Sequence, residues 1–183
     1  MGHWIRDAVV LRWAEMTAQL SAGELEPGRV LSRLLSGPDP SRMDSGIREL
    51  YDSARNDLQC VWTGRALGVD FEVDHAIPFT FWRASPSWNL FPATRSVNNA
   101  KRDKLPSAGL VRRQQERIVQ CWSLINRTYP SRFRREAALL IGHDPGRRWE
   151  NELFSSFVEA VEYTGNVRGA ERWEPGALAG RSG

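Results

Sequence analysis

The segments VDHAIP (residues 73–78), WNL (88–90) and RSVNNAK (95–101) decide the fold of the middle of this chain. They are predicted to form the end of a strand, a loop and a short helix, in that order. Such a unit can direct one side chain from the end of the strand and one from the helix into the same cavity. The polar residues of the three segments are therefore the first candidates for a functional site.

Two short strands are predicted before the loop. Residues 69–74 alternate apolar and acidic side chains, which is the period-two pattern of a half-buried strand, and residues 60–64 are mostly apolar up to a glycine. Because the two segments lie a few residues apart, we expect them to pair as an antiparallel hairpin. Residues 79–95 are expected to form a long irregular loop. The helix after it begins near Ser96 and must end before Pro106.

Apolar residues recur at helical spacing on both sides of this middle part. The predicted helices cover residues 4–20, 29–35, 44–55, 108–127, 133–141 and 149–161. We therefore expect an α+β chain in which a short antiparallel hairpin and a helix are embedded in a mainly helical domain. Its predicted regions are an N-terminal helical part (1–59), the middle motif (60–106), a C-terminal helical part (107–175) and a disordered tail (176–183).

The composition is that of a globular protein with a hydrophobic core. Hydrophobic residues make up 41% of the 183 residues, and eight tryptophans argue against wholesale disorder. Cys60 and Cys121 form no CxxC pair, so neither a disulfide framework nor a four-cysteine zinc site is expected. This cysteine usage fits a reducing, cytoplasmic location. No apolar run approaches the roughly 20 residues that span a bilayer, so no membrane partner is expected.

The distribution of charge says more than the net charge. A net charge of +3 does not by itself identify a nucleic-acid-binding protein. Residues 95–117, however, carry an excess of five positive charges. This segment is either a solvated helix face or a surface that contacts phosphates.

The polar residues of the motif suit phosphodiester hydrolysis. That reaction needs a water molecule to be deprotonated and aimed at phosphorus, and it needs the developing negative charge to be stabilised. His75 is the candidate general base. Asp74 and Asn98 offer oxygen ligands to one divalent cation, and an oxygen set with open positions suits Mg²⁺ or Mn²⁺ better than zinc. Because Asp74 and His75 leave a strand on opposite faces, a twist or bulge must bring both to one site.

These residues resemble the signature of the HNH (His-Me finger) endonuclease family. The signature is an Asp-His pair with a proline three residues after the histidine, here Asp74, His75 and Pro78. An Asn-Leu follows a loop, here residues 89–90, and then an Asn-x-x-Lys, here residues 98–101. Such a short motif is a hypothesis that the structural context must support.

The resemblance implies a fold, an activity and a role for each residue. The fold is the ββα-metal finger, and the activity is DNA endonuclease cleavage that nicks the duplex and leaves 5′-phosphate and 3′-hydroxyl ends. His75 would be the general base, and Asp74 and Asn98 would hold Mg²⁺ or Mn²⁺. Asn89 would hold the loop and orient His75 through hydrogen bonds to the backbone.

Basic residues around the motif are the predicted DNA contacts. They are Arg83, Arg95, Lys101, Arg102 and Lys104. The last three have an alternative explanation, because basic residues near the end of a short helix also interact favourably with the helix dipole.

The resemblance covers about residues 60–106 and departs from many relatives in one respect. Their CxxC pairs are absent, since Thr63 and Val97 stand in two of the cysteine positions, and no structural zinc is expected. Members of the bacterial subfamily that this chain resembles occur as nuclease modules of larger assemblies, CRISPR-associated interference complexes among them. The expected partners are therefore DNA and either a guide-RNA protein complex or a larger host chain.

Two alternatives stay open at this point. The chain could be a nucleic-acid-binding or assembly module that retains the HNH motif for structure. It could also be a nuclease that is idle until a partner delivers it to DNA, which the modest net charge favours. The motif does not predict a target sequence or an oligomeric state.

Overall fold

The computed structural model describes residues 11–13, 15–18, 26–29, 40–82, 84–146 and 148–176. The chain forms two compact units, residues 1–42 and 43–183. In the first unit, residues 11–13 and 15–18 are helical and fall within the predicted helix 4–20. The rest of that helix, the predicted helix 29–35 beyond residue 29, and the tail after residue 176 lie outside the described residues.

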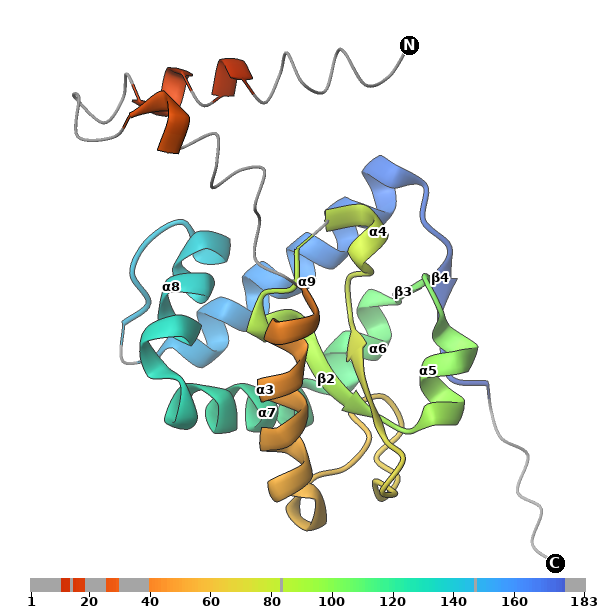
Figure 1. Cartoon of the computed structure of the whole chain (residues 1–183). Helices are drawn as coiled ribbons and strands as arrows, with labels where there is room; N and C mark the ends of the chain where they lie inside the picture. Colours follow the sequence, from red (N-terminus) through yellow and green to blue (C-terminus); the bar gives the residue numbers. More distant parts are fainter. Residues whose placement is uncertain are drawn as a thin grey trace, which may run out of the picture. The chain divides into compact units, whose positions relative to one another are not determined.

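The structure is mixed α and β, mostly helical, with a small antiparallel two-stranded sheet (Figure 1). In chain order the elements are α3 (Pro40–Ser53), η1 (Arg55–Asp57), β1 (Glu72–His75), α4 (Phe79–Trp82), η2 (Ser87–Asn89), β2 (Leu90–Ala93), α5 (Arg95–Lys101), β3 (Leu105–Pro106), α6 (Ala108–Arg113), α7 (Gln115–Thr128), α8 (Pro130–Ile141), α9 (Trp149–Arg168) and β4 (Arg172–Trp173). None of the helices in the described part of the chain has the length and apolarity needed to cross a bilayer.

The pairing of β1 corrects the expected hairpin. β1 pairs antiparallel with β2, with His75 opposite Leu90, so its partner comes from the segment that was predicted to be a loop. Residues 60–64, predicted as the other strand, instead form a turn that ends at Gly64, whose φ of +70° suits glycine. All four residues of β2 are buried. Because β2 is apolar throughout and contains a proline, its sequence shows no alternating pattern.

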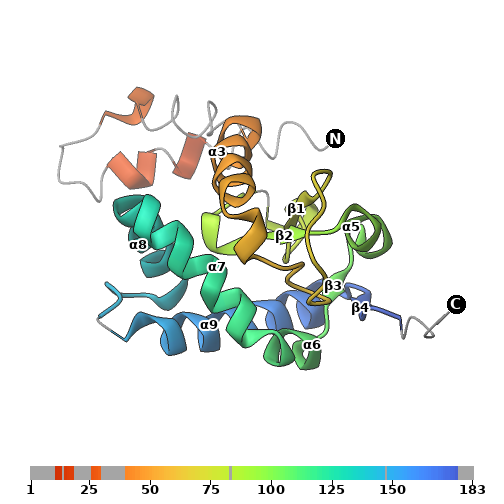
Figure 2. The ribbon, with the colours of Figure 1, turned by 90° about the horizontal axis from the view of Figure 1, so that it is seen from below.

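Helix α5 lies beside the β1–β2 sheet and contacts β1 (Figures 1 and 2). It follows β2 after one extended residue, Thr94, and ends before Arg102, whose φ is +54°. The helix predicted near Ser96 is therefore present, and it ends before Pro106 as expected. The order strand, strand, helix places the side chains of β1 opposite those of α5.

The C-terminal helices lie close to their predicted positions, with three differences. The predicted helix 108–127 is divided into α6 and α7, because Gln114, with φ of −100° and ψ of 11°, ends one helix and precedes the next. Helix α8 begins at Pro130, since proline is well suited to the first turn of a helix. Helix α9 continues beyond Val161 and ends at Arg168, before Gly169, whose φ is +60°. After α9, β4 pairs in parallel with β3.

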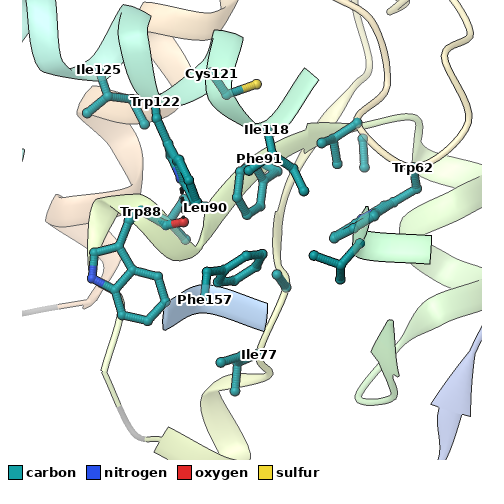
Figure 3. Close-up of a cluster of buried hydrophobic side chains, with 14 of the residues drawn as sticks. Trp62, Ile77, Trp88, Leu90, Phe91, Ile118, Cys121, Trp122, Ile125 and Phe157 are labelled. Atoms are coloured by element: carbon teal, nitrogen blue, oxygen red, sulfur yellow. Dashed lines mark hydrogen bonds between the residues drawn. The ribbon is translucent and has the colours of Figure 1, made fainter. Parts of the chain in front are cut away.

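One hydrophobic core joins the middle of the chain to the C-terminal helices. Trp122 of α7 is 0% exposed, and its ring centroid lies 6.3 Å from that of Phe91 on β2 and 5.6 Å from that of Phe157 on α9 (Figure 3). Its indole nitrogen donates a hydrogen bond of 2.8 Å to the backbone oxygen of Trp88. Since Phe91 lies opposite Asp74 in the sheet, helices α7 and α9 support the strands that carry the motif.

Both cysteines are free thiols inside this core, and we expect them to be unreactive in the folded protein. Cys60 is 0% exposed and Cys121 is 1% exposed. Burial raises the pKa of Cys121 to about 12, so its reactive thiolate is scarce at neutral pH. A thiol reagent such as DTNB should label neither cysteine in buffer and both in urea. Rapid labelling without denaturant would contradict the observed burial.

Candidate active site

His75 is the last residue of β1, and its ring lies against the segment that follows the strand. Its Nε2 is 2.8 Å from the hydroxyl oxygen of Ser85, and its ring meets that of Phe79 edge-on at a centroid distance of 6.4 Å. Ser85 is buried, whereas His75 is only partly buried. The imidazole is therefore held by a buried polar group and still reaches the surface.

Asn89 clamps the turn that follows His75. Its Oδ1 accepts a hydrogen bond from the Ile77 N–H, and its Nδ2 donates one to the Ile77 carbonyl, both at 2.8 Å. The Ala76 N–H donates a further bond of 3.0 Å to the Asn89 backbone oxygen. Asn89 is completely buried. These are the kind of backbone contacts that the resemblance implies for this residue.

Glu136 of α8 holds the segment that precedes Asn89. Its carboxylate accepts hydrogen bonds from both the N–H and the hydroxyl of Ser87, the first at 2.6 Å. The Trp88 indole nitrogen donates a bond of 3.2 Å to the Glu136 backbone oxygen, and Arg132 pairs with the Glu136 carboxylate at 2.9 Å. The contacts of Glu136 with Ser87 and Trp88 link parts of the chain that are far apart in sequence. Helix α8 therefore supports the clamp at a distance.

Replacing Asn89 with alanine is expected to destabilise the protein by about 2–4 kcal/mol. The change leaves the buried N–H and C=O of Ile77 without partners, and each unsatisfied group costs about 1–3 kcal/mol. Urea denaturation followed by tryptophan fluorescence measures the free energy of unfolding. Asn99→Ala is the matched control, because Asn99 is exposed on α5, and it should change this free energy by less than about 0.5 kcal/mol. Equal effects of the two substitutions would rule out the clamp.

Asp74 forms a buried ion pair with Lys101. Its Oδ1 lies 2.9 Å from Lys101 Nζ, and the side chains of the two residues are 3% and 0% exposed. Its Oδ2 accepts a hydrogen bond of 2.6 Å from the indole nitrogen of Trp62. Burial raises the pKa of Asp74, while the Lys101 ammonium and the Trp62 indole oppose this shift by stabilising the carboxylate.

Asn98 faces β1 one helical turn before Lys101. Its Nδ2 donates a hydrogen bond of 2.5 Å to one oxygen of Glu72, and Arg95 Nε lies 3.1 Å from the other. The hydrogen bond from Asn98, followed by the interaction with Arg95, lowers the pKa of Glu72. Since Asn99 is exposed, Asn98 is the amide of the pair that faces the strand.

As arranged, Asp74 and Asn98 do not fit a shared divalent cation. Each oxygen of Asp74 accepts a hydrogen bond, one of them from the Lys101 ammonium, and Asn98 bonds to Glu72 through its Nδ2. The carboxylates of Glu72 and Asp74 are matched by Arg95 and Lys101, so the cluster has no excess negative charge. No group of three or more His, Cys, Asp or Glu side chains in the described ranges is placed to hold a metal ion. The metal role stays a prediction that this arrangement does not favour.

One of the predicted DNA contacts, Lys101, is not a surface group. Lys101 is completely buried, so the predicted phosphate contact stays a prediction that this burial does not favour. The physical reason is that α5 turns this position toward β1, where Asp74 neutralises the ammonium. Arg83 lies outside the described residues.

The remaining predicted contacts lie at or near the surface. Arg95 pairs with Glu72, and Lys104 pairs with Glu171 at 2.5 Å. Exposed ion pairs of this kind contribute little stability, so phosphate can compete for both cations. Arg102 is exposed. Its positive φ is unusual for a residue other than glycine.

A surface hollow of about 430 Å³ adjoins the start of α5. Its lining consists of polar residues from the loop before β1 and from the first turns of the helix, namely Asp70, Thr94, Arg95, Ser96 and Asn99. The lining contains neither His75 nor Asp74. The hollow is therefore separate from the side chains that the motif predicts to be catalytic.

Three residues that contact the motif residues carry different sequence signals. Glu72 lies two positions before Asp74, so the alternation of the strand already predicts that both side chains share a face. Ser85 and Trp62 come from irregular segments with no periodic pattern. Only the tertiary structure brings these two to His75 and Asp74.

Comparisons of the chain with protein-family models, with curated proteins and with solved structures gave no match. The resemblance to HNH endonucleases therefore rests on the motif residues alone.

Proposed function

We propose that the chain is a DNA endonuclease of the HNH type that hydrolyses phosphodiester bonds with His75 as the general base. The observation that supports the proposal is the convergence of separate parts of the motif on His75. Ser85 bonds to its ring, Asn89 clamps the turn after it, and Lys101 of α5 bonds to its backbone oxygen. A base that removes a proton from an aimed water molecule needs such a defined orientation.

The contact with Ser85 gives the two ring nitrogens of His75 different roles in the proposed mechanism. In the proposed tautomer, Nε2 carries the hydrogen and donates it to the Ser85 hydroxyl oxygen, 2.8 Å away. The lone pair is then on Nδ1, which accepts the proton of the water molecule that attacks phosphorus. Histidine suits this task because its ordinary pKa of about 6.5 lies close to neutral pH.

Mg²⁺ or Mn²⁺ is the cofactor to be tested, because the resemblance implies one. The proposed products are a 5′-phosphate and a 3′-hydroxyl end. A site with a single histidine cuts one strand per encounter, so cleavage of both strands needs a second site or a second visit.

Delivery by a partner is part of the proposal. The net charge is +3, and two of the predicted phosphate contacts, Arg95 and Lys104, form ion pairs within the protein. Non-specific affinity for DNA increases with the number of phosphates that a protein neutralises. An RNA-guided or defence complex, or a larger host chain, would add to the DNA affinity of this chain.

Nicking of supercoiled plasmid tests the proposal. The purified protein is incubated with plasmid at low salt in Mg²⁺, Mn²⁺ or EDTA, and the open-circular form is quantified. We expect nicks with a metal ion and none with EDTA. A DNA ligase should reseal the nicks, because their ends are a 5′-phosphate and a 3′-hydroxyl. If the folded protein cuts neither plasmid nor single-stranded DNA with either metal, autonomous cleavage is wrong.

The Asp74–Lys101 ion pair favours a second candidate function. A motif that is retained only for structure would have its carboxylate satisfied by internal partners, as Asp74 is. The chain would then be a nucleic-acid-binding or assembly module. DNA binding without nicking, unchanged by His75→Ala, would identify this function.

A further inference from the structure

Lys101 joins α5 to the end of β1 through two contacts. Its Nζ lies 2.9 Å from Asp74 Oδ1 and donates a hydrogen bond of 2.7 Å to the backbone oxygen of His75. The side chain is 0% exposed. Its contact with Asp74 is buried, and its contact with the His75 carbonyl is partly buried. Lysine is almost never fully buried unless it is paired. Here its partners are the two residues of the Asp-His motif.

The second oxygen of Asp74, Oδ2, is also bonded to a buried donor. Trp62, which is 1% exposed, donates its indole N–H to Asp74 Oδ2 at 2.6 Å. The Trp62 ring packs edge-on against Phe91 with a centroid distance of 5.9 Å, so the core keeps this donor in place. A metal ion on Asp74 would either lie beside the Lys101 ammonium in the interior, where the two cations repel each other, or displace Lys101 and leave a buried charge without its partner. Both arrangements are strongly unfavourable.

The peptide unit that follows His75 is bound at both of its polar groups. Lys101 donates to the His75 carbonyl at 2.7 Å, and the Ala76 N–H donates to the Asn89 backbone oxygen at 3.0 Å. These two groups belong to the same planar peptide unit. Binding both of them restricts rotation of that plane and so restricts the direction in which the His75 side chain leaves the backbone.

We propose that Lys101 is a positioning residue for His75 and the permanent cation of Asp74, so that Asp74 is the counter-ion of Lys101 and not a metal ligand. The inference rests on the proposed function, because it gives His75 the role of the base. It differs from the expectation that Asp74 and Asn98 hold a cation and that Lys101 binds phosphate. A divalent cation that the nuclease uses is then held without Asp74.

Titration with Mn²⁺, followed by electron paramagnetic resonance, tests the role of Asp74. The proteins are the wild type, Asp74→Asn and Glu72→Gln. Glu72→Gln is the matched control, because Glu72 lies on the same face of β1 as Asp74 and its substitution removes the same charge. We expect the dissociation constant for Mn²⁺ to change no more in Asp74→Asn than in Glu72→Gln. A loss of affinity at least about tenfold larger in Asp74→Asn would overturn the proposal. A wild type that binds no Mn²⁺ at millimolar concentrations supports it.

Cleavage and DNA binding by Lys101→Met test the positioning role. We expect nicking at saturating DNA to slow by about tenfold or more, because small displacements of a catalytic group cost up to about 100-fold. DNA affinity and its salt dependence should match the wild type, since Lys101 is completely buried. Arg102→Met is the matched control, an exposed neighbour whose loss should weaken binding and reduce the salt slope by about 1.

Two results would overturn this role. If Lys101→Met shows the pattern expected of Arg102→Met, Lys101 is a phosphate contact. If its folded fraction nicks DNA at the wild-type rate, Lys101 only stabilises the fold.

A double-mutant cycle tests the ion pair without any cleavage assay. Lys101→Met and Asp74→Asn each leave one buried charge unpaired and should each lower the melting temperature by roughly 10 °C. The double variant removes both charges and should recover most of this loss. Additive losses would show that the two residues do not form a pair. If Lys101→Met does not fold, the double variant replaces it in the cleavage and DNA-binding measurements.

The inference and the proposed function can fail separately. The Mn²⁺ titration and the unfolding cycle do not depend on nuclease activity. If the wild type does not nick DNA, the imidazole NMR signals of His75, identified by their absence in His75→Ala, report on its orientation. They should shift in Lys101→Met, and unchanged signals would contradict the positioning role.

Discussion

Replacing His75 with alanine is expected to lower the rate of DNA nicking by roughly a thousandfold, because a positioned general base contributes about 10²–10⁴ to a rate. His75 is only partly buried at the end of β1, so the fold should tolerate the substitution. Single-turnover nicking of plasmid measures the rate, and a gel-shift assay measures DNA affinity. We expect the DNA affinity to stay near the wild-type value, because the substitution removes the proposed general base and no predicted phosphate contact.

His143→Ala is the matched control for this prediction. The His143 side chain is 61% exposed and pairs with Glu152 at 2.8 Å, away from the motif residues in the sequence. We expect this variant to nick DNA at the wild-type rate. If His75→Ala keeps the wild-type rate as well, His75 is not the base. If both variants lose nicking activity equally, the loss in His75→Ala does not show that His75 is the general base.

Replacing Trp122 with alanine is expected to destabilise the protein by about 3–5 kcal/mol, the range for removing a large aromatic side chain from a core. The Trp122 ring lies near Phe91 and Phe157, and its indole N–H donates to the Trp88 carbonyl at 2.8 Å. The substitution opens a cavity and leaves that carbonyl without its partner. Urea denaturation should show a lower midpoint with an unchanged m-value.

Two further variants separate the causes of this loss. Trp122→Phe keeps most of the ring volume and removes the hydrogen bond to Trp88, so a smaller loss of about 1–2 kcal/mol is expected. Leu139→Ala is the surface control, because Leu139 is 83% exposed, and it should change the free energy of unfolding by less than about 0.5 kcal/mol. If Trp122→Ala is as stable as Leu139→Ala, Trp122 is not part of the core.

Features of the site that depend on local patterns were predicted well. The helix expected near Ser96 is α5, because its beginning and its end depend on residues close by in the chain. The backbone contacts expected of Asn89 are present at Ile77. The alternation before His75 predicted a strand, and β1 occupies its second half. Spacing alone was sufficient for α5 and β1, because each depends on neighbours within a few residues. The contacts of Asn89 with Ile77 span 12 residues and were expected from the resemblance.

The partner of β1 shows where local patterns stop being informative. Residues 60–64 and 90–93 are both short and largely apolar, and the periodicity does not indicate which of them pairs with β1. The structure pairs β2 with β1, in a position where all four residues of β2 are buried. That pairing depends on helices far along the chain, since Trp122 of α7 contacts Phe91.

The sequence by itself determined which chemical groups stand at which spacing, and so it predicted an Asp-His pair at a strand end, an asparagine after a loop and a helix with Asn98 and Lys101 one turn apart. Only the tertiary structure decided that Lys101 points inward to Asp74 and the His75 carbonyl, while Ser85 reaches the His75 ring. The reason is physical. A charged side chain is exposed by default, and whether it is buried instead depends on a partner that the folded chain brings to it from elsewhere in the sequence.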